Sequence, residues 1–106
     1  MLRVAVRRVN PGRADELWEW LAEVDGPRRE EALATLVDEG CTHEQAFLIE
    51  GAEGPVVIYV MEVDDDEASQ VAAQLSEHPI DADHKRVMAQ VVGDSLPSEL
   101  LLALRR

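Results

Sequence analysis

The sequence predicts a single α+β domain in which strands and amphipathic helices alternate. Its length of 106 residues allows one hydrophobic core and leaves no room for a second. Some stretches place apolar residues at every second position, as strands do, and others at helical spacing. Turn-forming glycine and proline separate these stretches, and no linker or repeat interrupts them. The whole chain, residues 1–106, is therefore expected to fold as one unit.

The first part of the chain predicts a strand and an interrupted helix. Residues 2–9 alternate and are β-rich, and residues 10–12 form a turn. The helix that follows has one apolar face, made of Ala14, Leu17, Trp18, Leu21 and Val24. Residues 25–27 (Asp-Gly-Pro) interrupt it, and a second helical piece resumes at Arg28. The inward residues of that piece are expected to be Ala32, Leu33, Leu36 and Val37. Gly40 is typical of the residue just after a helix.

The middle of the chain predicts a hairpin and a further helix. Residues 42–50 and 55–63 are strands joined by the short loop 51–54. Asp64 is the expected N-cap of the next helix, because Glu67 follows at capping-box spacing. That helix runs to about Glu77. Its inward residues are expected to be Ala68, Val71, Ala72 and Leu75.

The last part predicts a short helix and a final strand. The helix covers about residues 81–92, and residues 93–97 form a loop. Residues 99–105 are predicted as a strand, although Ser95 or Ser98 could also cap a helix there. The order of elements is then β-α-β-β-α-(α)-β, the ferredoxin-like split βαβ arrangement.

The two faces of the predicted sheet differ in composition, because side chains alternate along each strand. One set is aliphatic and is expected under the helices: Leu2, Val4, Val6, Phe47, Ile49, Val56, Ile58 and Val60. The other set mixes polar and apolar residues: Arg3, Ala5, Arg7, Glu44, Ala46, Leu48, Tyr59 and Met61. Two sheets packed through such mixed faces would form a homodimer and enclose a small-molecule cavity. In the alternative, Arg3 or Arg7 only pairs with Glu44 across strands.

Residues 78–84, His-Pro-Ile-Asp-Ala-Asp-His, concentrate titratable groups at the start of a predicted helix. Asp81 is expected to be its N-cap, and His84 then shares an inward stripe with Ile80, Val87 and Val91. The helix N-terminus disfavours imidazolium and the Asp81 charge favours it, which suits His84 to proton transfer. Alternatives are a buried structural His84, or a metal bound by His78, Asp81 and His84 with Glu44.

Composition excludes several classes of protein. A formal net charge of −12 argues against nucleic acid and anionic membranes as partners. The longest apolar stretch is far too short to cross a bilayer, and the N-terminus lacks a signal-peptide core, so a cytoplasmic protein is expected. The lone Cys41 is expected to be a small buried hydrophobe, or else a catalytic thiol beside His43 on the same strand face. No phosphate-binding loop, nucleophile elbow or HExxH motif occurs.

Several segments resemble a family of small uncharacterised bacterial and archaeal proteins of the dimeric α/β-barrel superfamily. They are Pro11-Gly12 through Trp18, residues 28–40, Glu44 to Leu48, Tyr59 to Glu62, and residues 78–84. The resemblance implies the fold and a homodimer rather than an activity. The wider superfamily includes cofactor-free monooxygenases, sugar mutarotases, haem-degrading enzymes and muconolactone-type isomerases. Residues whose chemistry exceeds packing needs within the match are Glu39, Glu44, Tyr59, Asp81 and His84, and the leucine-rich last strand departs from the pattern.

The predicted function is a small-molecule site, either cofactor-free acid–base catalysis of the isomerase or mutarotase kind, or non-enzymatic ligand binding or a structural homodimer. Cofactor-free oxygenation of a reactive substrate is a further alternative. In the enzymatic hypothesis His84 is the base or acid, Asp81 orients it, and Glu44 and Tyr59 are partner and polariser. Candidate substrate-binding residues are Arg3, Arg7, Glu39, Leu48, Met61 and Trp18.

Overall fold

The computed structural model describes all of residues 1–106 and has four strands and four helices. In chain order these are β1 (Leu2–Val9), α1 (Ala14–Asp25), α2 (Arg29–Asp38), β2 (Cys41–Gly51), β3 (Gly54–Val63), α3 (Asp66–Leu75), α4 (Pro79–Val91) and β4 (Val92–Leu96). The predicted order of strands and helices is confirmed. No helix has the length and apolar character that crossing a membrane requires.

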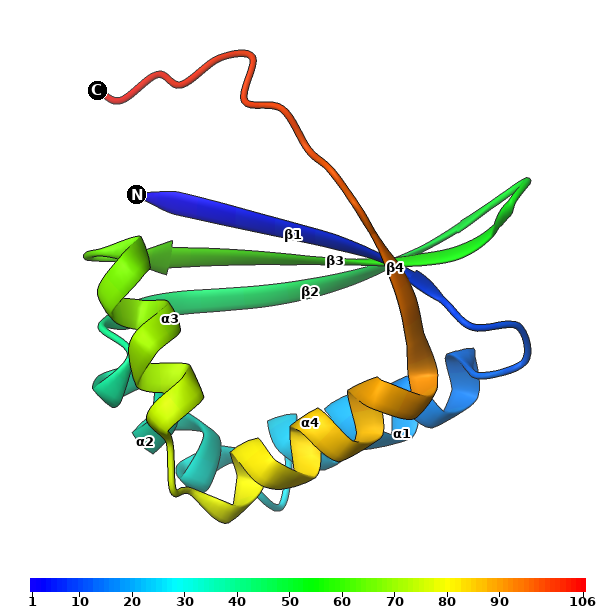
Figure 1. Cartoon of the computed structure of the whole chain (residues 1–106), viewed down its shortest axis with the longest axis horizontal. Helices are drawn as coiled ribbons and strands as arrows, with labels where there is room; N and C mark the ends of the chain where they lie inside the picture. Colours follow the sequence, from blue (N-terminus) through cyan, green and yellow to red (C-terminus); the bar gives the residue numbers. More distant parts are fainter.

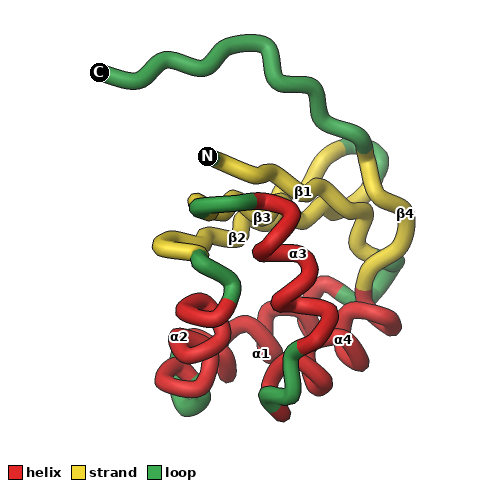
Figure 2. The backbone as a smooth tube through the Cα atoms, turned by 60° about the vertical axis from the view of Figure 1, so that its left-hand side comes forward, coloured by secondary structure: helices red, strands yellow, loops and turns green.

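The four strands form one antiparallel sheet in the order β2-β3-β1-β4. This strand order together with the element order is the ferredoxin-like arrangement. All four helices lie on one side of the sheet, and the C-terminal residues pass over its other side (Figure 1; Figure 2). The sheet therefore has one face covered by helices and one face that its own chain leaves open.

Helix and strand boundaries follow local signals, with small differences from the prediction. The β2–β3 hairpin is tighter than predicted, since Gly51 pairs with Gly54 and two residues form the loop. Asp65, and not Asp64, caps α3, because its Oδ1 accepts the backbone N–H of Ala68 at 2.9 Å. Gly40 has the positive φ of +61° expected just after a helix.

The prediction for the last strand is wrong. β4 is Val92–Leu96, the segment expected to be a loop, and residues 97–106 have no regular structure. β4 pairs with β1 through only three residue pairs and an irregular register. Arg7 supports this short strand by donating from Nε and Nη2 to the carbonyl of Gly93, at 3.1 and 2.8 Å.

The prediction of which sheet face meets the helices is also wrong, and the two sets are exchanged. The mixed set faces the helices, as Val57, on the same face of β3 as Tyr59, packs with Leu17, Met88 and Val91 in the larger core cluster. The aliphatic set lies on the open face, where Leu2 is 61% exposed and Phe47 and Ile49 are each 50% exposed. The mixed set therefore lies between the sheet and the helices of one chain, and not between two sheets.

The helices bury different residues from those predicted. On α1 Trp20 is buried and Trp18 is 67% exposed. Leu17, Trp20 and Val24 follow each other at i, i+3 and i+7, so Trp20 lies nearer the centre of the inward stripe. Thr35 and Ser69 are buried on α2 and α3, whereas the predicted inward residues Leu33, Val37, Val71 and Leu75 are exposed.

Candidate functional site

One cross-strand row on the helix-facing side of the sheet carries opposite charges at its two ends. It runs from Glu44 on β2 through Met61 on β3 to Arg3 on β1. Arg3 donates from Nη1 to Asp66 Oδ1 at 3.2 Å and from Nη2 to Met61 Sδ at 3.3 Å. The alternative in which Arg3 or Arg7 simply pairs with Glu44 is therefore wrong. Glu44 makes no ion pair, and it remains available for another partner.

The next row has Tyr59 at its centre, with Ala46 on β2 and Ala5 on β1 as cross-strand neighbours. The two small side chains leave the phenol without a large neighbour on either side within the sheet. On the helix side of the sheet, the His84 ring of α4 lies edge-on to the Tyr59 ring, with 6.3 Å between the ring centroids. The Tyr59 hydroxyl has only a weak partner, the Sδ of Met88 at 4.0 Å. Burial, followed by the charge of Glu44, raises the pKa of Tyr59, so its hydroxyl keeps its proton.

His84 is held by Trp20 of α1, whose Nε1–H donates to His84 Nδ1 at 2.8 Å. The indole nitrogen is only a donor, so Nδ1 is the unprotonated nitrogen and the neutral ring carries its proton on Nε2. An imidazolium would place two donors against each other. Burial lowers the pKa of His84 as well, and the charge of Asp81 opposes this only in part. His84 is therefore a neutral ring whose Nε2–H is its one available donor.

The free nitrogen of His84 is not sealed in the core. His84 is partly buried, and its Nε2 has no partner within the chain. No fully buried side-chain nitrogen or oxygen of the protein lacks a hydrogen bond. It follows that Nε2 reaches solvent-accessible space, where a ligand atom or water can accept its proton.

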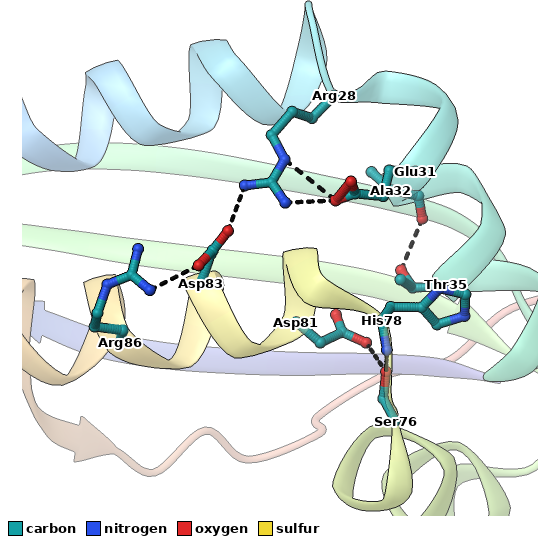
Figure 3. Close-up of polar contacts among 9 residues, drawn as sticks. All are labelled: Arg28, Glu31, Ala32, Thr35, Ser76, His78, Asp81, Asp83 and Arg86. Carbon is teal, nitrogen blue, oxygen red and sulfur yellow. Dashed lines mark hydrogen bonds and ion pairs between the residues drawn. The ribbon is translucent and has the colours of Figure 1, made fainter.

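Asp81 occupies a different place from the predicted one. The helix α4 begins at Pro79, so His78 is the N-cap position and Asp81 lies in the first turn. Its carboxylate accepts the hydroxyl of Ser76, and its backbone N–H donates to the carbonyl of His78 (Figure 3). The predictions of Asp81 as N-cap and as the group that orients His84 are wrong, because Trp20 provides that orientation. Asp81 acts on His84 only through its charge.

Two carboxyl groups lie near one another beside the Tyr59 row. Burial, with the charges of Asp81 and Glu44, raises the pKa of Glu39 to about 7, although Arg3 opposes the shift. Burial also raises the pKa of Glu44, again against the effect of Arg3. Glu44 keeps contact with solvent at the edge strand, while the surrounding protein displaces part of its hydration. Both carboxyl groups therefore hold a proton more readily than an ordinary surface carboxyl does.

Three predicted substrate-binding residues lie apart from this cluster. Trp18 points outward from α1. Arg7 donates its hydrogen bonds to the Gly93 carbonyl, and Leu48 packs at the edge of the larger core. Of the other candidates, Arg3 and Met61 share the Glu44 row, and Glu39 is close enough to interact with Glu44.

The cysteine and metal alternatives find no support in the geometry. A bulge between Cys41 and His43 puts them on opposite sheet faces, and the thiol donates to the His43 carbonyl at 3.3 Å rather than to its ring. Burial raises the pKa of Cys41, which disfavours the thiolate. His78 Nε2 lies 2.7 Å from Asp38 Oδ2 of α2. No three His, Cys, Asp or Glu side chains come together as metal ligands.

Sequence reasoning missed Trp20 and the residues that support it. The guanidinium of Arg28 lies over the Trp20 ring, 5.6 Å from its centroid. It also donates to Glu31 and to Asp83, and the bond to Asp83 ties α4 to the start of α2 (Figure 3). Asp83 accepts a further bond from Arg86 of the same helix. The available signal was that a tryptophan three residues after Leu17 is inward, and that a buried indole N–H needs an acceptor.

Two shallow grooves adjoin the cluster from different sides. One, of about 410 Å³, lies between β1 and α3 and includes Arg3 and Ala5. The other, of about 380 Å³, lies between α1 and α4 and includes Trp20 and Arg28. Neither groove is lined by Glu44, Tyr59 or His84.

Comparison with known proteins identifies a family and a fold. The chain belongs to the family of unknown function DUF6176, whose profile matches residues 2–106. A comparison with curated proteins gave no match. Among solved structures it is similar to the crystal structure of PA3566 from Pseudomonas aeruginosa, with 20% identity and a TM-score of 0.58 over 97% of this chain and 92% of the other. This similarity supports the fold alone, and the dimeric barrel stays a prediction.

Proposed function

We propose that this member of the DUF6176 family is an acid–base catalyst that moves a proton on a small organic molecule, in an isomerisation or mutarotation. The observation that carries the proposal is the grouping of Glu44, Tyr59 and a neutral His84 on the helix-facing side of the sheet. Non-enzymatic binding of a small molecule at the same place is the alternative. It would use the same hydrogen-bond donors without transferring a proton.

Glu44 is the proposed base. Its raised pKa makes the ionised form a better proton acceptor than an ordinary surface carboxylate. The ionised Glu44 would take a proton from a carbon next to a carbonyl. The C–H electron pair would become the C=C bond of an enolate while the C=O π pair moves onto the carbonyl oxygen. Returning the proton to a different atom completes an isomerisation with no net change in atoms or electrons.

His84 and Tyr59 are the proposed polarisers. Each offers a neutral donor, the Nε2–H of the imidazole and the hydroxyl of the phenol. Such donors stabilise the negative charge that develops on a carbonyl oxygen, and a neutral imidazole does so without giving up its proton. The roles differ from the sequence hypothesis, in which His84 was itself the base or acid.

The experiment follows proton exchange, which can be detected whatever the final product is. The intact protein is incubated with galactose, pyruvate and cyclohexanone, and exchange is followed by NMR as anomer interconversion or as deuterium uptake next to the carbonyl. We expect acceleration with at least one probe. The Glu44→Gln variant should lose about 100-fold or more of that rate, in line with loss of a positioned base. His84→Gln should lose about tenfold to 100-fold.

The matched control is Glu50→Gln, which makes the same change on the same strand. Glu50 is exposed and pairs with Pro55 at the far end of the hairpin. Its variant should keep the full rate. Binding of a probe without any exchange above the solvent rate would favour the ligand-binding alternative, and an unchanged rate in Glu44→Gln would contradict the assignment of the base.

We further propose that the protein works as a homodimer formed through the open sheet face. That face presents the eight aliphatic and aromatic residues of the set named above, several of them half exposed. A continuous apolar surface of this kind on a small domain is typical of an interface. In the dimer the two sheets pack face to face and each helix-covered site remains within its own chain.

A further inference from the structure

The C-terminal arm, residues 97–106, is a second apolar surface that the chain leaves uncovered. It has no regular structure, and it passes over the open side of the sheet (Figure 1). Its four leucines are almost fully exposed: Leu100 at 82%, Leu101 at 88%, Leu102 at 72% and Leu104 at 83%. Water-exposed leucines in this number stabilise nothing within the chain, so their contact lies elsewhere.

The arm contacts the rest of the chain at its two ends and not along its length. At its start it continues β4, which pairs with β1. Near its end Arg105 Nη2 bonds Glu62 Oε1 at 2.8 Å, and Arg105 is itself 74% exposed. Between these points the leucines do not pack on the sheet below, because Leu2, Val4 and Phe47 on that face are also exposed. The chain thus has two apolar surfaces on one side, and neither covers the other.

The surface area indicates how much contact is missing. The chain exposes 7569 Å², whereas a compact monomer of 11.8 kDa exposes about 5,900 Å². The excess of about 1,700 Å² is roughly twice the 800 Å² that each partner contributes to an interface of standard size. The radius of gyration of 14.1 Å also exceeds the value of about 13 Å for a compact chain of this length.

We propose that the arm packs on a second copy of this chain and clasps it in the dimer. The inference rests on the homodimer proposed above and adds to it an element of the interface. The occupant is a second copy because both uncovered surfaces lie on the same side of the chain, where the partner's sheet would lie. The arm also brings Arg106 to a partner whose formal net charge is −12.

The test is the dissociation constant of the dimer, measured by sedimentation velocity over a dilution series of the full-length chain. The double variant Leu101→Asp, Leu104→Asp should raise the dissociation constant at least tenfold. Ser98→Asp, which adds a charge to the same arm without removing a leucine, should leave it within twofold. Phe47→Asp, on the sheet face, tests the dimer independently of the arm.

The outcomes separate the two proposals. If Phe47→Asp weakens the dimer and the leucine variant does not, the arm inference is wrong and the sheet dimer stands. If the leucine variant lowers the melting temperature equally at all concentrations with no change in dissociation constant, the arm packs on its own chain and the inference is again overturned. If the unaltered chain is a monomer at every concentration, both proposals fail.

Discussion

At the scale of single residues, the site depends on how one imidazole is held. His84 could be picked from the sequence as an inward histidine, and the structure agrees with that placement. Its partner could not be picked, because Trp20 is 64 residues away and the apolar pattern of α1 favoured Trp18. The hydrogen bond fixes which nitrogen carries the proton, and thereby changes the role of His84 from base to donor.

Replacing Trp20 tests this role. In Trp20→Phe the donor to His84 Nδ1 is lost, so the penalty against imidazolium falls and the pKa of His84 should rise toward its ordinary value. The fold should also lose about 1–2 kcal/mol, since a partly buried acceptor loses its partner. Long-range ¹H–¹⁵N NMR across a pH titration measures the first effect. Trp18→Phe is the control, and an unchanged His84 pKa in Trp20→Phe would refute the assignment.

The carboxyl pair predicts a dependence of stability on pH. Glu39 has a pKa of about 7 in the folded chain and about 4.5 when unfolded, so the folded state binds the extra proton between these values. Its stabilising effect is complete below about pH 4.5 and is lost as the pH rises to 7. Between pH 5 and pH 8 the free energy of unfolding should therefore fall less in Glu39→Gln than in the unaltered chain. Allowing for partial solvent access, we expect the difference to be about 1–2 kcal/mol. Urea denaturation at pH 5 and pH 8 checks this. Identical pH dependence in both proteins would count against a raised Glu39 pKa.

At the scale of elements, the spacing of apolar residues along the sequence predicted the order of strands and helices, but it did not locate the last strand. β4 contains Gly93 and Asp94, which are uncommon in strands, so its sequence favours a loop. Tertiary contacts decide otherwise, since Arg7 donates twice to the Gly93 carbonyl from a strand 86 residues away. The leucine-rich segment after it was the predicted strand, and it pairs with no strand of its own chain.

Removing that contact should weaken the β1–β4 edge. We expect Arg7→Ala to cost about 1–3 kcal/mol of unfolding free energy, because two charge-assisted hydrogen bonds are lost. Arg7→Lys should not restore the full value, since an ammonium cannot donate in the same forked geometry. The control is Arg8→Ala, whose exposed pair with Glu53 at 3.7 Å should be worth less than about 0.5 kcal/mol. Equal losses for Arg7→Ala and Arg8→Ala in urea denaturation would contradict this account.

At the scale of the whole molecule, the main lesson concerns the two faces of one sheet. The alternation of side chains divided the strands into the correct two sets, but the sequence does not say which set the helices cover. The more apolar set was expected inside a single chain. The helices instead bury Trp20, Thr35 and Ser69 and carry His84, which suits the mixed face. The aliphatic face is free to bury itself against a second chain, an interaction that a single sequence does not reveal.

Because only the open face of the sheet is expected to contact a second chain, a charge placed there should affect the dimer and a charge placed on the helix side should not. Phe47→Asp puts a carboxylate on the open face, halfway along the edge strand β2, and should raise the dissociation constant of the dimer at least 100-fold. Leu33→Asp makes the same change on the helix side, where Leu33 is 44% exposed, and should have no such effect. Sedimentation velocity distinguishes them. Equal behaviour of the two variants would show that the open face is not the interface.

The central claim is that Tyr59 has a neutral imidazole edge-on to its ring and a carboxyl group with a raised pKa near its hydroxyl. The most direct measurement is an NMR titration of the intact chain, with ¹⁵N observed at His84 and the side-chain carboxyl ¹³C at Glu39 and Glu44. The account predicts that at neutral pH His84 is uncharged with its proton on Nε2, and that Glu39 is still taking up its proton near pH 7. A charged His84 at pH 7 together with both carboxyls titrating below pH 5 would contradict it.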